Sequence, residues 1–197
     1  MIDLEAQLRR ISTELRSLGC AFALVGGLAV SARAEPRLTR DADFAVSVLD
    51  DGQAEEIVLA LLQRGYFAAA AVEQEATGRL ATVRLGDGSG AGVVADLLFA
   101  SCGIEPEIVA AADELAVVSG LVLPVASVGH LIAMKLLARD DRRRPLDADD
   151  LRALQAIAAQ DDWEVAERAV QLIVDRGYAR GRDLPQALQV LRDHGAY

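Results

Sequence analysis

The apolar pattern of the chain changes in character at about residue 126, and this change constrains the fold more than any other feature. Before it, short apolar runs end at glycines or polar turns, a pattern typical of strands in a sheet. After it, apolar residues recur at helical spacing over 127–140, 147–160, 163–177 and 184–195. We therefore predict an α+β protein with a mixed β-sheet lobe flanked by helices (1–126) and a C-terminal helical lobe (127–197).

Individual segments of the first lobe have clear patterns. Leu4, Leu8, Ile11, Leu15 and Leu18 predict an amphipathic helix over residues 3–18 that ends at Gly19. Further helices are expected at LAVSARA and QAEEIVLALLQR. The expected strands are AFALV, DADFAVSV, YFAAAAV, RLATVRL and GVVADLLFA, followed by a hairpin of LAVV and LVLPV. In the second lobe, Ser127 is expected to cap the first helix.

Composition limits the classes of function. The chain has 30 acidic and 20 basic residues, a net charge of -10, which disfavours a protein that coats nucleic acid through a general positive field. Any contact with RNA must therefore be local. Cys20 and Cys102 lack metal-binding spacing and are interpreted as core thiols. With no signal-peptide pattern and no apolar run long enough to span a bilayer, we expect a cytoplasmic protein with no membrane partner.

Three aspartates are candidates for a metal site. Asp41 and Asp43 are two residues apart on a predicted strand, so their side chains are expected on the same face. Asp96 lies within an otherwise apolar segment, where an unpaired carboxylate would cost several kcal/mol. Carboxylates on adjacent strands suit Mg²⁺, including a two-ion site. Alternatively, these acids pair with Arg37, Arg40 or Arg84, or simply mark the exposed ends of strands.

A glycine pair precedes these acids. Gly26 and Gly27 lie between a predicted strand and a predicted helix, where unhindered backbone N–H groups and a positive helix end can face a triphosphate. Such a pair is an ordinary tight turn at least as often, so its meaning depends on the acids that follow. The second glycine cluster, GDGSGAG, precedes a strand and is interpreted as a hairpin loop.

Together, the segments GGLAVSARAEPRLTRDAD and VVADLL resemble the signature of the DNA polymerase beta nucleotidyltransferase superfamily. More narrowly, Arg37-x-Thr39-x-Asp41-x-Asp43 and LPVASVGHLIAMKLLARDDRRRPLDADDL resemble the AbiEii-like branch, which includes MenT-type toxins of type IV toxin–antitoxin systems. The resemblance covers residues 3–155. It implies a nucleotidyltransferase fold, a nucleoside triphosphate (NTP) substrate, two Mg²⁺ ions and a cognate antitoxin.

The resemblance also implies roles for particular residues. Asp41, Asp43 and Asp96 would be the catalytic and metal-binding acids. The nucleotide-binding residues would be Gly26, Gly27, Ser31, Arg40, Lys135, Asp147 and Asp150. One departure is visible, because relatives commonly have a hydroxyl residue close after the glycine pair, where this chain has Leu28, Ala29 and Val30 before Ser31.

Basic residues near the predicted site are candidates for contacts with phosphate groups. Lys135 is the only lysine among the twenty basic residues and can contact phosphate as a compact charge, or lie at the rim of its helix. The cluster of Arg139, Arg142, Arg143 and Arg144 can guide a polyanionic acceptor such as a tRNA 3′ end, although pairing with Asp140 and Asp141 is the slightly favoured interpretation.

We therefore predict transfer of a nucleoside monophosphate from an NTP to an acceptor hydroxyl of tRNA or another RNA, by the toxin of a toxin–antitoxin system. Two alternatives remain open. One is a non-catalytic nucleotide-binding or partner-binding module of the same fold, suggested by the missing hydroxyl after the glycine pair. The other is a small-molecule nucleotidyltransferase of the aminoglycoside type, because the acidic charge is compatible with cationic substrates.

Overall fold

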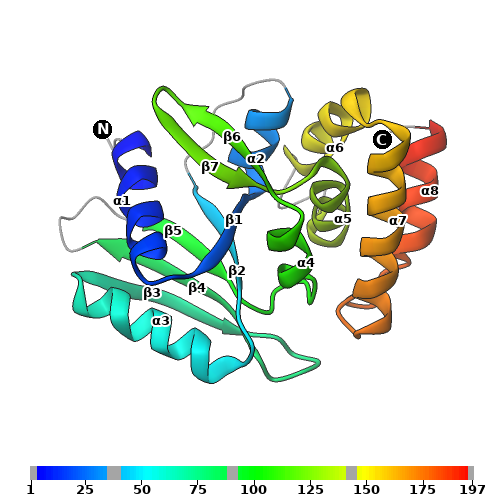
Figure 1. The fold of residues 1–197 in the computed structure, drawn as a ribbon. Helices are drawn as coiled ribbons and strands as arrows, with labels where there is room; N and C mark the ends of the chain where they lie inside the picture. Colours follow the sequence, from blue (N-terminus) through cyan, green and yellow to red (C-terminus); the bar gives the residue numbers. More distant parts are fainter. Residues whose placement is uncertain (1–3, 35–40, 88–92, 141–145, 195–197) are drawn as a thin grey trace.

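A computed structural model describes residues 4–34, 41–87, 93–140 and 146–194 (Figure 1). The helices are α1 (Leu4–Ser17), α2 (Gly26–Arg33), α3 (Asp51–Gln63), α4 (Glu105–Ala110), α5 (Val128–Ala138), α6 (Leu146–Ile157), α7 (Gln160–Asp175) and α8 (Leu184–His194). The strands are β1 (Ala21–Val25), β2 (Asp43–Ser47), β3 (Tyr66–Glu73), β4 (Leu80–Asp87), β5 (Val93–Leu98), β6 (Asp113–Val118) and β7 (Leu121–Val125). The α+β class is confirmed.

The described strands form one seven-stranded mixed sheet in the order β3-β4-β5-β2-β1-β7-β6. β2 pairs with β5, and β1 with β7, in parallel, while the other neighbours are antiparallel. The predicted hairpin is β6–β7. Because β2 and β5 are adjacent although far apart in sequence, the acids on these two strands become neighbours.

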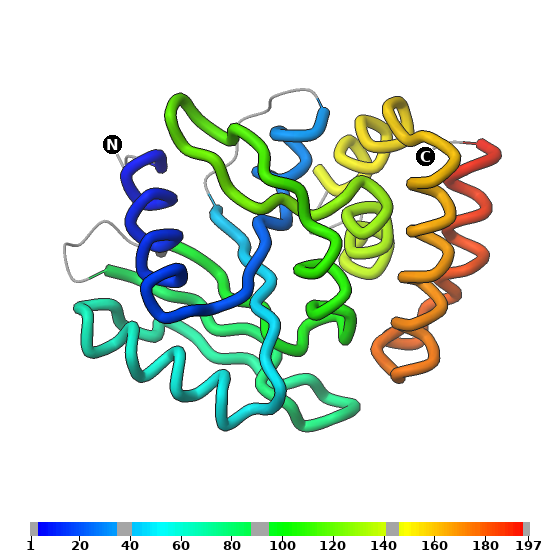
Figure 2. Tube along the Cα trace, in the orientation of Figure 1, coloured from blue at the N-terminus to red at the C-terminus, as the bar shows by residue number. Residues whose placement is uncertain are grey.

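Helices pack on the sheet and beside it. α1 contacts β1 and β5, and α3 contacts β3 and β4. The helices after β7 contact one another and form a group beside the sheet (Figure 1). In the tube view, α1 and α8 lie on opposite sides of the molecule (Figure 2). A single hydrophobic core runs from Leu8 on α1 to Leu191 on α8, so the lobe boundary at 126/127 stays a prediction.

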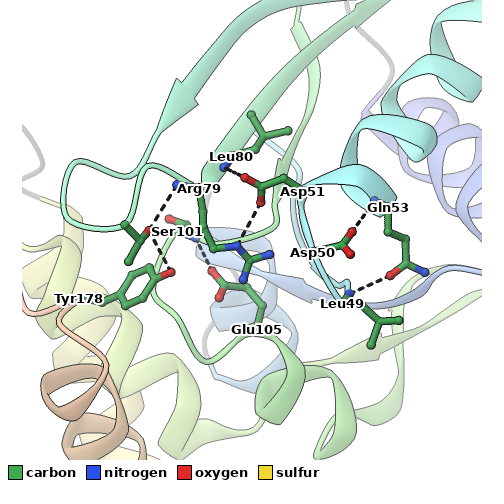
Figure 3. A network of polar contacts seen from close by, with 10 residues as sticks. Leu49, Asp50, Asp51, Gln53, Arg79, Leu80, Ser101, Glu105 and Tyr178 are labelled. Atoms are coloured by element: carbon green, nitrogen blue, oxygen red, sulfur yellow. Dashed lines mark hydrogen bonds and ion pairs between the residues drawn. The ribbon is translucent and has the colours of Figure 1, made fainter.

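Local sequence explains the start of α3. Asp50 is the N-cap of α3, where its side chain accepts a hydrogen bond from the backbone N–H of Gln53 at 3.0 Å. The side chain of Gln53 accepts one from the N–H of Leu49 at 2.8 Å (Figure 3). Ser127 is the N-cap residue of α5, as predicted. Its hydroxyl makes no hydrogen bond to a backbone N–H of the first turn and is instead hydrogen-bonded to Nδ1 of His130 at 2.9 Å.

Two further expectations need correction. The acid pair was expected to open one strand, but β2 begins at Asp43, and Asp41 precedes it as an exposed residue without strand structure. The strand and the helix expected around the glycine pair are present. The expected turn between them is absent, because β1 ends at Val25 and α2 begins at Gly26. No helix of the described ranges is both long and apolar enough to cross a membrane.

Candidate functional site

Charged residues form a row across three neighbouring strands. Asp43 on β2 lies opposite Asp96 on β5, and Asp96 lies opposite Arg84 on β4. Residues directly opposite each other in a sheet project to the same face, so the three side chains share one surface. The backbone N–H of Asp96 donates to the carbonyl of Ala42 at 2.8 Å, which fixes the register beside Asp43. Pairing of β2 with β5 thus creates the row.

Arg84 neutralises Asp96. Its Nε donates to Oδ1 of Asp96 at 2.8 Å, and its Nη2 donates to Oδ2 at 2.6 Å. The Asp96 side chain is only 13% exposed, so the guanidinium supplies the positive partner that a nearly buried carboxylate requires. The hydrogen bond and charge of Asp96 raise the pKa of Arg84, and the charges of Asp41 and Asp43 contribute further. The electrostatic field of all three acids therefore reaches one guanidinium.

Gly26 lies directly against Asp43. A Cβ at Gly26 would overlap Oδ2 of Asp43 and lie 2.7 Å from its Cγ, and Gly26 has a φ of +66°, which L side chains rarely adopt. Glycine is therefore required here for two independent reasons. The carboxylate of Asp43 approaches the first residue of α2, where backbone N–H groups can receive an anion.

These residues border a pocket of about 530 Å³ between the sheet and α5, a volume in the range of small-molecule sites. Gly26, Asp43, Arg84 and Asp96 belong to its sheet side. Residues of α5 and of later segments form the other side of the lining: Leu131, Met134, Lys135, Leu137, Ala138, Asp140, Arg180 and Arg182. The pocket thus brings together residues from both halves of the chain.

Lys135 is held by two acids of α6. Its Nζ lies 2.7 Å from Oδ1 of Asp147 and 2.7 Å from Oδ2 of Asp150. All three side chains are largely buried, and Asp150 is fully buried. Oδ2 of Asp147 is buried without a hydrogen-bond partner. Asp147 and Asp150 therefore fix the direction of the Lys135 ammonium, and neither of them lines the pocket itself.

The remaining predicted residues either do not line the pocket or lie outside the described residues. Gly27 and Ser31 lie within α2, where the Ser31 hydroxyl donates to the Gly27 carbonyl at 3.0 Å, and neither lines the pocket. Asp41 does not line it either. Arg40, like Arg37, Thr39 and the cluster Arg142, Arg143 and Arg144, lies outside the described residues.

The donor set at the row suits a hard divalent cation. Mg²⁺ binds through one or two carboxylates and completes its coordination with water and substrate phosphates. Asp43 and Asp96 supply two such carboxylates on adjacent strands, and the Asp43 carboxylate lies directly against Gly26 at the start of α2. Within the described parts of the chain, no three His, Cys, Asp or Glu residues are grouped so as to hold a metal by themselves. The residues therefore fit an ion that is shared with substrate.

Cys102 lines the pocket but is not a reactive thiol. Burial raises the pKa of Cys102 well above its ordinary value, and the neighbouring Glu105 raises it further. One oxygen of Glu105 accepts a hydrogen bond from the backbone N–H of Ser101 at 2.6 Å (Figure 3). The same oxygen accepts one from the N–H of Cys102 at 2.8 Å. The segment after β5 is thereby fixed. The interpretation of Cys102 as a core thiol is supported by its burial.

A family model matches residues 8–194 and is described as the nucleotidyl transferase AbiEii toxin of type IV toxin–antitoxin systems. The chain belongs to this AbiEii family. The predicted resemblance is therefore confirmed, and it extends beyond residue 155. No curated protein sequence matches the chain.

Solved structures agree with the fold of the AbiEii chain. An antigenic nucleotidyltransferase-like protein from Paracoccidioides brasiliensis is 18% identical, with a TM-score of 0.55 over 95% of this chain and 92% of that one. The lincosamide antibiotic adenylyltransferase LnuA is 15% identical, with a TM-score of 0.51 over 78% and 98%. The antibiotic-resistance factor ANT(2'')-Ia is 15% identical, with a TM-score of 0.52 over 98% and 91%. The AbiEii chain therefore has a nucleotidyltransferase fold. The family to which it belongs is one of nucleotidyl transferases.

Sequence reasoning missed part of the pocket of this AbiEii protein. The sequence indicates Arg84 only as one of three possible ion-pair partners for the acids. Arg180 and Arg182, from the segment between α7 and α8, also line the pocket. No sequence motif includes these two arginines, and they reach the pocket only through the packing of the C-terminal helices.

Proposed function

We propose that the protein transfers a nucleoside monophosphate from an NTP to an acceptor hydroxyl in a Mg²⁺-dependent reaction. The observation that carries this proposal is the register of β2 and β5, which sets Asp43 opposite Asp96 at a pocket that Gly26 and Lys135 also line. Two carboxylates, a helix N-terminus and a buried lysine are the groups that phosphoryl transfer requires.

In this proposal, Asp43 and Asp96 hold Mg²⁺, and Asp41 contributes from its position just before β2. The bound ion would neutralise charge on the phosphates. The α2 N-terminus at Gly26 and Gly27 binds the β- and γ-phosphates through backbone N–H groups, with Ser31 and Arg40 as further nucleotide contacts. Lys135, directed by Asp147 and Asp150, contributes a compact positive charge to the same phosphates.

The chemical step follows from these positions. The acceptor oxygen forms a bond to the α-phosphorus while the bond between the α- and β-phosphates breaks, and pyrophosphate leaves. The proton of the acceptor hydroxyl passes to a carboxylate oxygen of Asp96. Because Arg84 binds both oxygens of Asp96, that guanidinium must move as metal and substrate bind.

We further propose a tRNA or another RNA as acceptor, action in the cytoplasm as a toxin, and control by a cognate antitoxin. The family description supports the toxin and the antitoxin. The deciding experiment incubates the purified chain with Mg²⁺, each α-labelled NTP and a whole-cell extract, and then resolves RNA, protein and small molecules. Label in RNA supports the proposal, and label in protein or small molecules alone contradicts the RNA acceptor.

One observation favours a second candidate, a nucleotide-binding module without catalysis. Arg84 binds both oxygens of Asp96, and this ion pair would have to open before a metal could bind. Titration calorimetry with Mg²⁺ and each NTP separates the candidates when combined with an assay for released pyrophosphate. Binding without turnover on any cellular RNA would favour the module.

A small-molecule acceptor is the remaining alternative. The net charge of -10 is compatible with a cationic substrate. LnuA and ANT(2'')-Ia share only the fold at their level of identity. Label transferred to an aminoglycoside and not to RNA would favour this alternative.

A further inference from the structure

Arg180 has an unusual backbone conformation at the edge of the pocket. It has a φ of 53° and is the only non-glycine residue with positive φ in the described part of the chain. Gly181 follows with a φ of 70°, and the N–H of Arg182 donates to the carbonyl of Ala179 at 3.0 Å. Positive φ at both central positions is the pattern of a type I′ turn, which favours Asn, Asp or Gly at its first central position. An arginine there is strained.

The segment around this turn is held firmly in place. Arg176 forms an ion pair with Glu107 at 2.6 Å, and the ring of Tyr178 packs so closely on Gly103 that a Cβ there would lie 2.5 Å from it. The hydroxyl of Tyr178 also lies 3.4 Å from that of Thr77 in the β3–β4 connection (Figure 3). Arg180 itself donates to the carbonyl of Ser101 at 2.9 Å. The surrounding structure therefore maintains the strain.

Arg180 and Arg182 also differ from the other arginines in charge pairing. Neither guanidinium lies within ion-pair distance of an Asp or Glu among the described residues. Every other described arginine, Arg139 aside, has a carboxylate oxygen within 4.0 Å. Arg139 has an interaction of its own. In a chain with ten more acidic than basic residues, two unneutralised arginines on one pocket wall are notable.

We propose that Arg180, with Arg182, forms a subsite that binds a phosphate group of the acceptor. This inference rests on the proposed nucleotidyltransferase function and names the class of its acceptor as anionic. Two guanidiniums that have no carboxylate partner within the described ranges are suited to charge-assisted hydrogen bonds with phosphate oxygens. They repel a cationic aminoglycoside, so this wall selects against the small-molecule alternative.

The position of the turn assigns the subsite to the acceptor and not to the donor. Gly26 and Lys135 provide the positive groups for the triphosphate. Arg180 and Arg182 come from the α7–α8 connection, and Arg180 is hydrogen-bonded to Ser101, which follows β5 beyond Asp96. Asp96, the proposed proton acceptor for the attacking hydroxyl, thus belongs to the strand that leads to this subsite.

The strained conformation provides a test that separates binding from folding. Arg180→Gly and Arg180→Asn both fit a positive φ, so neither lowers the melting temperature. Both weaken the binding of bulk tRNA and of a short single-stranded RNA oligonucleotide about tenfold, as expected for one lost charge-assisted hydrogen bond. Arg180→Lys retains part of the affinity. The control is Arg168→Ala, because Arg168 is an exposed residue of α7 outside the pocket. This substitution changes neither the melting temperature nor the affinity for RNA.

Three outcomes decide the inference. Weaker RNA binding with unchanged affinity for each NTP supports an acceptor subsite. Unchanged RNA binding overturns it, as does a loss of NTP affinity without a loss of RNA affinity, because the arginines would then serve the donor. RNA binding is measured without NTP or metal. A wild-type protein that binds RNA through Arg180 but transfers no nucleotide would therefore contradict the proposed function and leave the subsite supported.

Discussion

Gly26 and Asp43 form a contact that requires glycine at position 26. The carboxylate of Asp43 occupies the space where any other residue at position 26 would place its Cβ. This contact links the strand that carries the acid to the helix that receives phosphate. At the scale of single residues, the site therefore depends on a missing side chain as much as on charged groups.

Gly26→Ala should abolish transfer, because the new Cβ displaces Asp43. Gly19→Ala is the matched control, since Gly19 has a φ of +70° and its added Cβ would meet nothing within 4 Å. Positive φ alone should cost about 1 kcal/mol of unfolding free energy in the control. Gly26→Ala should cost more and reduce activity at least about a hundredfold. Equal effects of the two substitutions on activity would refute the role of the contact.

His130 makes stability depend on pH. Burial lowers the pKa of His130 below its ordinary value of 6.5, Glu107 opposes this effect, and Arg168 adds to it. As the pH falls through 6.5, the unfolded chain binds a proton at His130 before the folded protein does. The unfolding free energy therefore falls on acidification, and His130 contributes fully only above that pH.

This dependence can be isolated with His130→Asn. Urea unfolding of the wild type and the variant is compared at about pH 7.5 and about pH 5.5. The wild type should lose more free energy between the two conditions than the variant does. If the variant loses as much unfolding free energy on acidification as the wild type does, then protonation of carboxylates, and not of His130, causes the loss.

Single residues differ in how far the sequence predicts them. Gly26, Asp43, Asp96 and Lys135 were predicted and line one pocket. Spacing and apolar context mark the glycine and the two acids, whereas the role of Lys135 was implied by the family resemblance. Arg180 was not predicted. Its position depends on a turn in which Arg180 has a positive φ, a conformation that arginine seldom adopts. The backbone preference of arginine therefore does not predict this turn.

At the scale of elements, α5 carries Lys135 and packs closely on α7. A Cβ at Gly129 would overlap the backbone oxygen of Asp162 and lie 2.7 Å from Cβ of Val165. This glycine therefore sets the distance between the two helices. The orientation of Lys135 toward the pocket depends on that packing and on the ion pairs from α6.

Gly129→Ala should force the two helices apart, because backbone atoms cannot yield as a flexible side chain would. We expect a loss of about 1 to 3 kcal/mol of unfolding free energy, measured by urea denaturation. Gly52→Ala in α3 is the control, since its Cβ would meet only Asp50 Oδ1 at 3.3 Å. It should be neutral or stabilising by up to about 1 kcal/mol. A stable Gly129→Ala protein would contradict this account of the packing.

Most elements were predicted because each has its own pattern of apolar residues. The seven strands and the helices other than α4 appear where periodicity or β-branched composition indicates them. α4 was missed because six residues are too few to show helical periodicity. Asp41 was expected on the strand DADFAVSV, which β-branched and aromatic residues indicate, whereas the strand begins only at Asp43.

At the scale of the whole molecule, the strand order could not be predicted. β5 lies beside β2 through contacts between distant segments, and no local pattern specifies that neighbour. The convergence of Asp43 and Asp96 was nevertheless expected, because a nearly buried carboxylate needs a positive partner and a divalent cation shared by several carboxylates would supply one. The partner found is Arg84, one of the three considered.

The net charge of -10 predicts that RNA binding is local and depends only moderately on salt. Each phosphate contact contributes about 0.7 to 0.9 to the slope of log affinity against log salt concentration. Arg180→Asn should reduce this slope by about one, and Arg168→Ala should leave it unchanged. An unaltered slope in Arg180→Asn would indicate that phosphate binds elsewhere.

The most direct test is the Mg²⁺-dependent incorporation of labelled nucleoside monophosphate by the wild type and by Asp43→Asn. The substitution keeps the shape of the side chain beside Gly26 and removes its charge. The exposed Asp193→Asn serves as control. The account predicts that Asp43→Asn folds with the wild-type melting temperature and loses at least about a hundredfold in activity, while Asp193→Asn is unaffected. Full Mg²⁺-dependent activity in Asp43→Asn would contradict the assignment of the site.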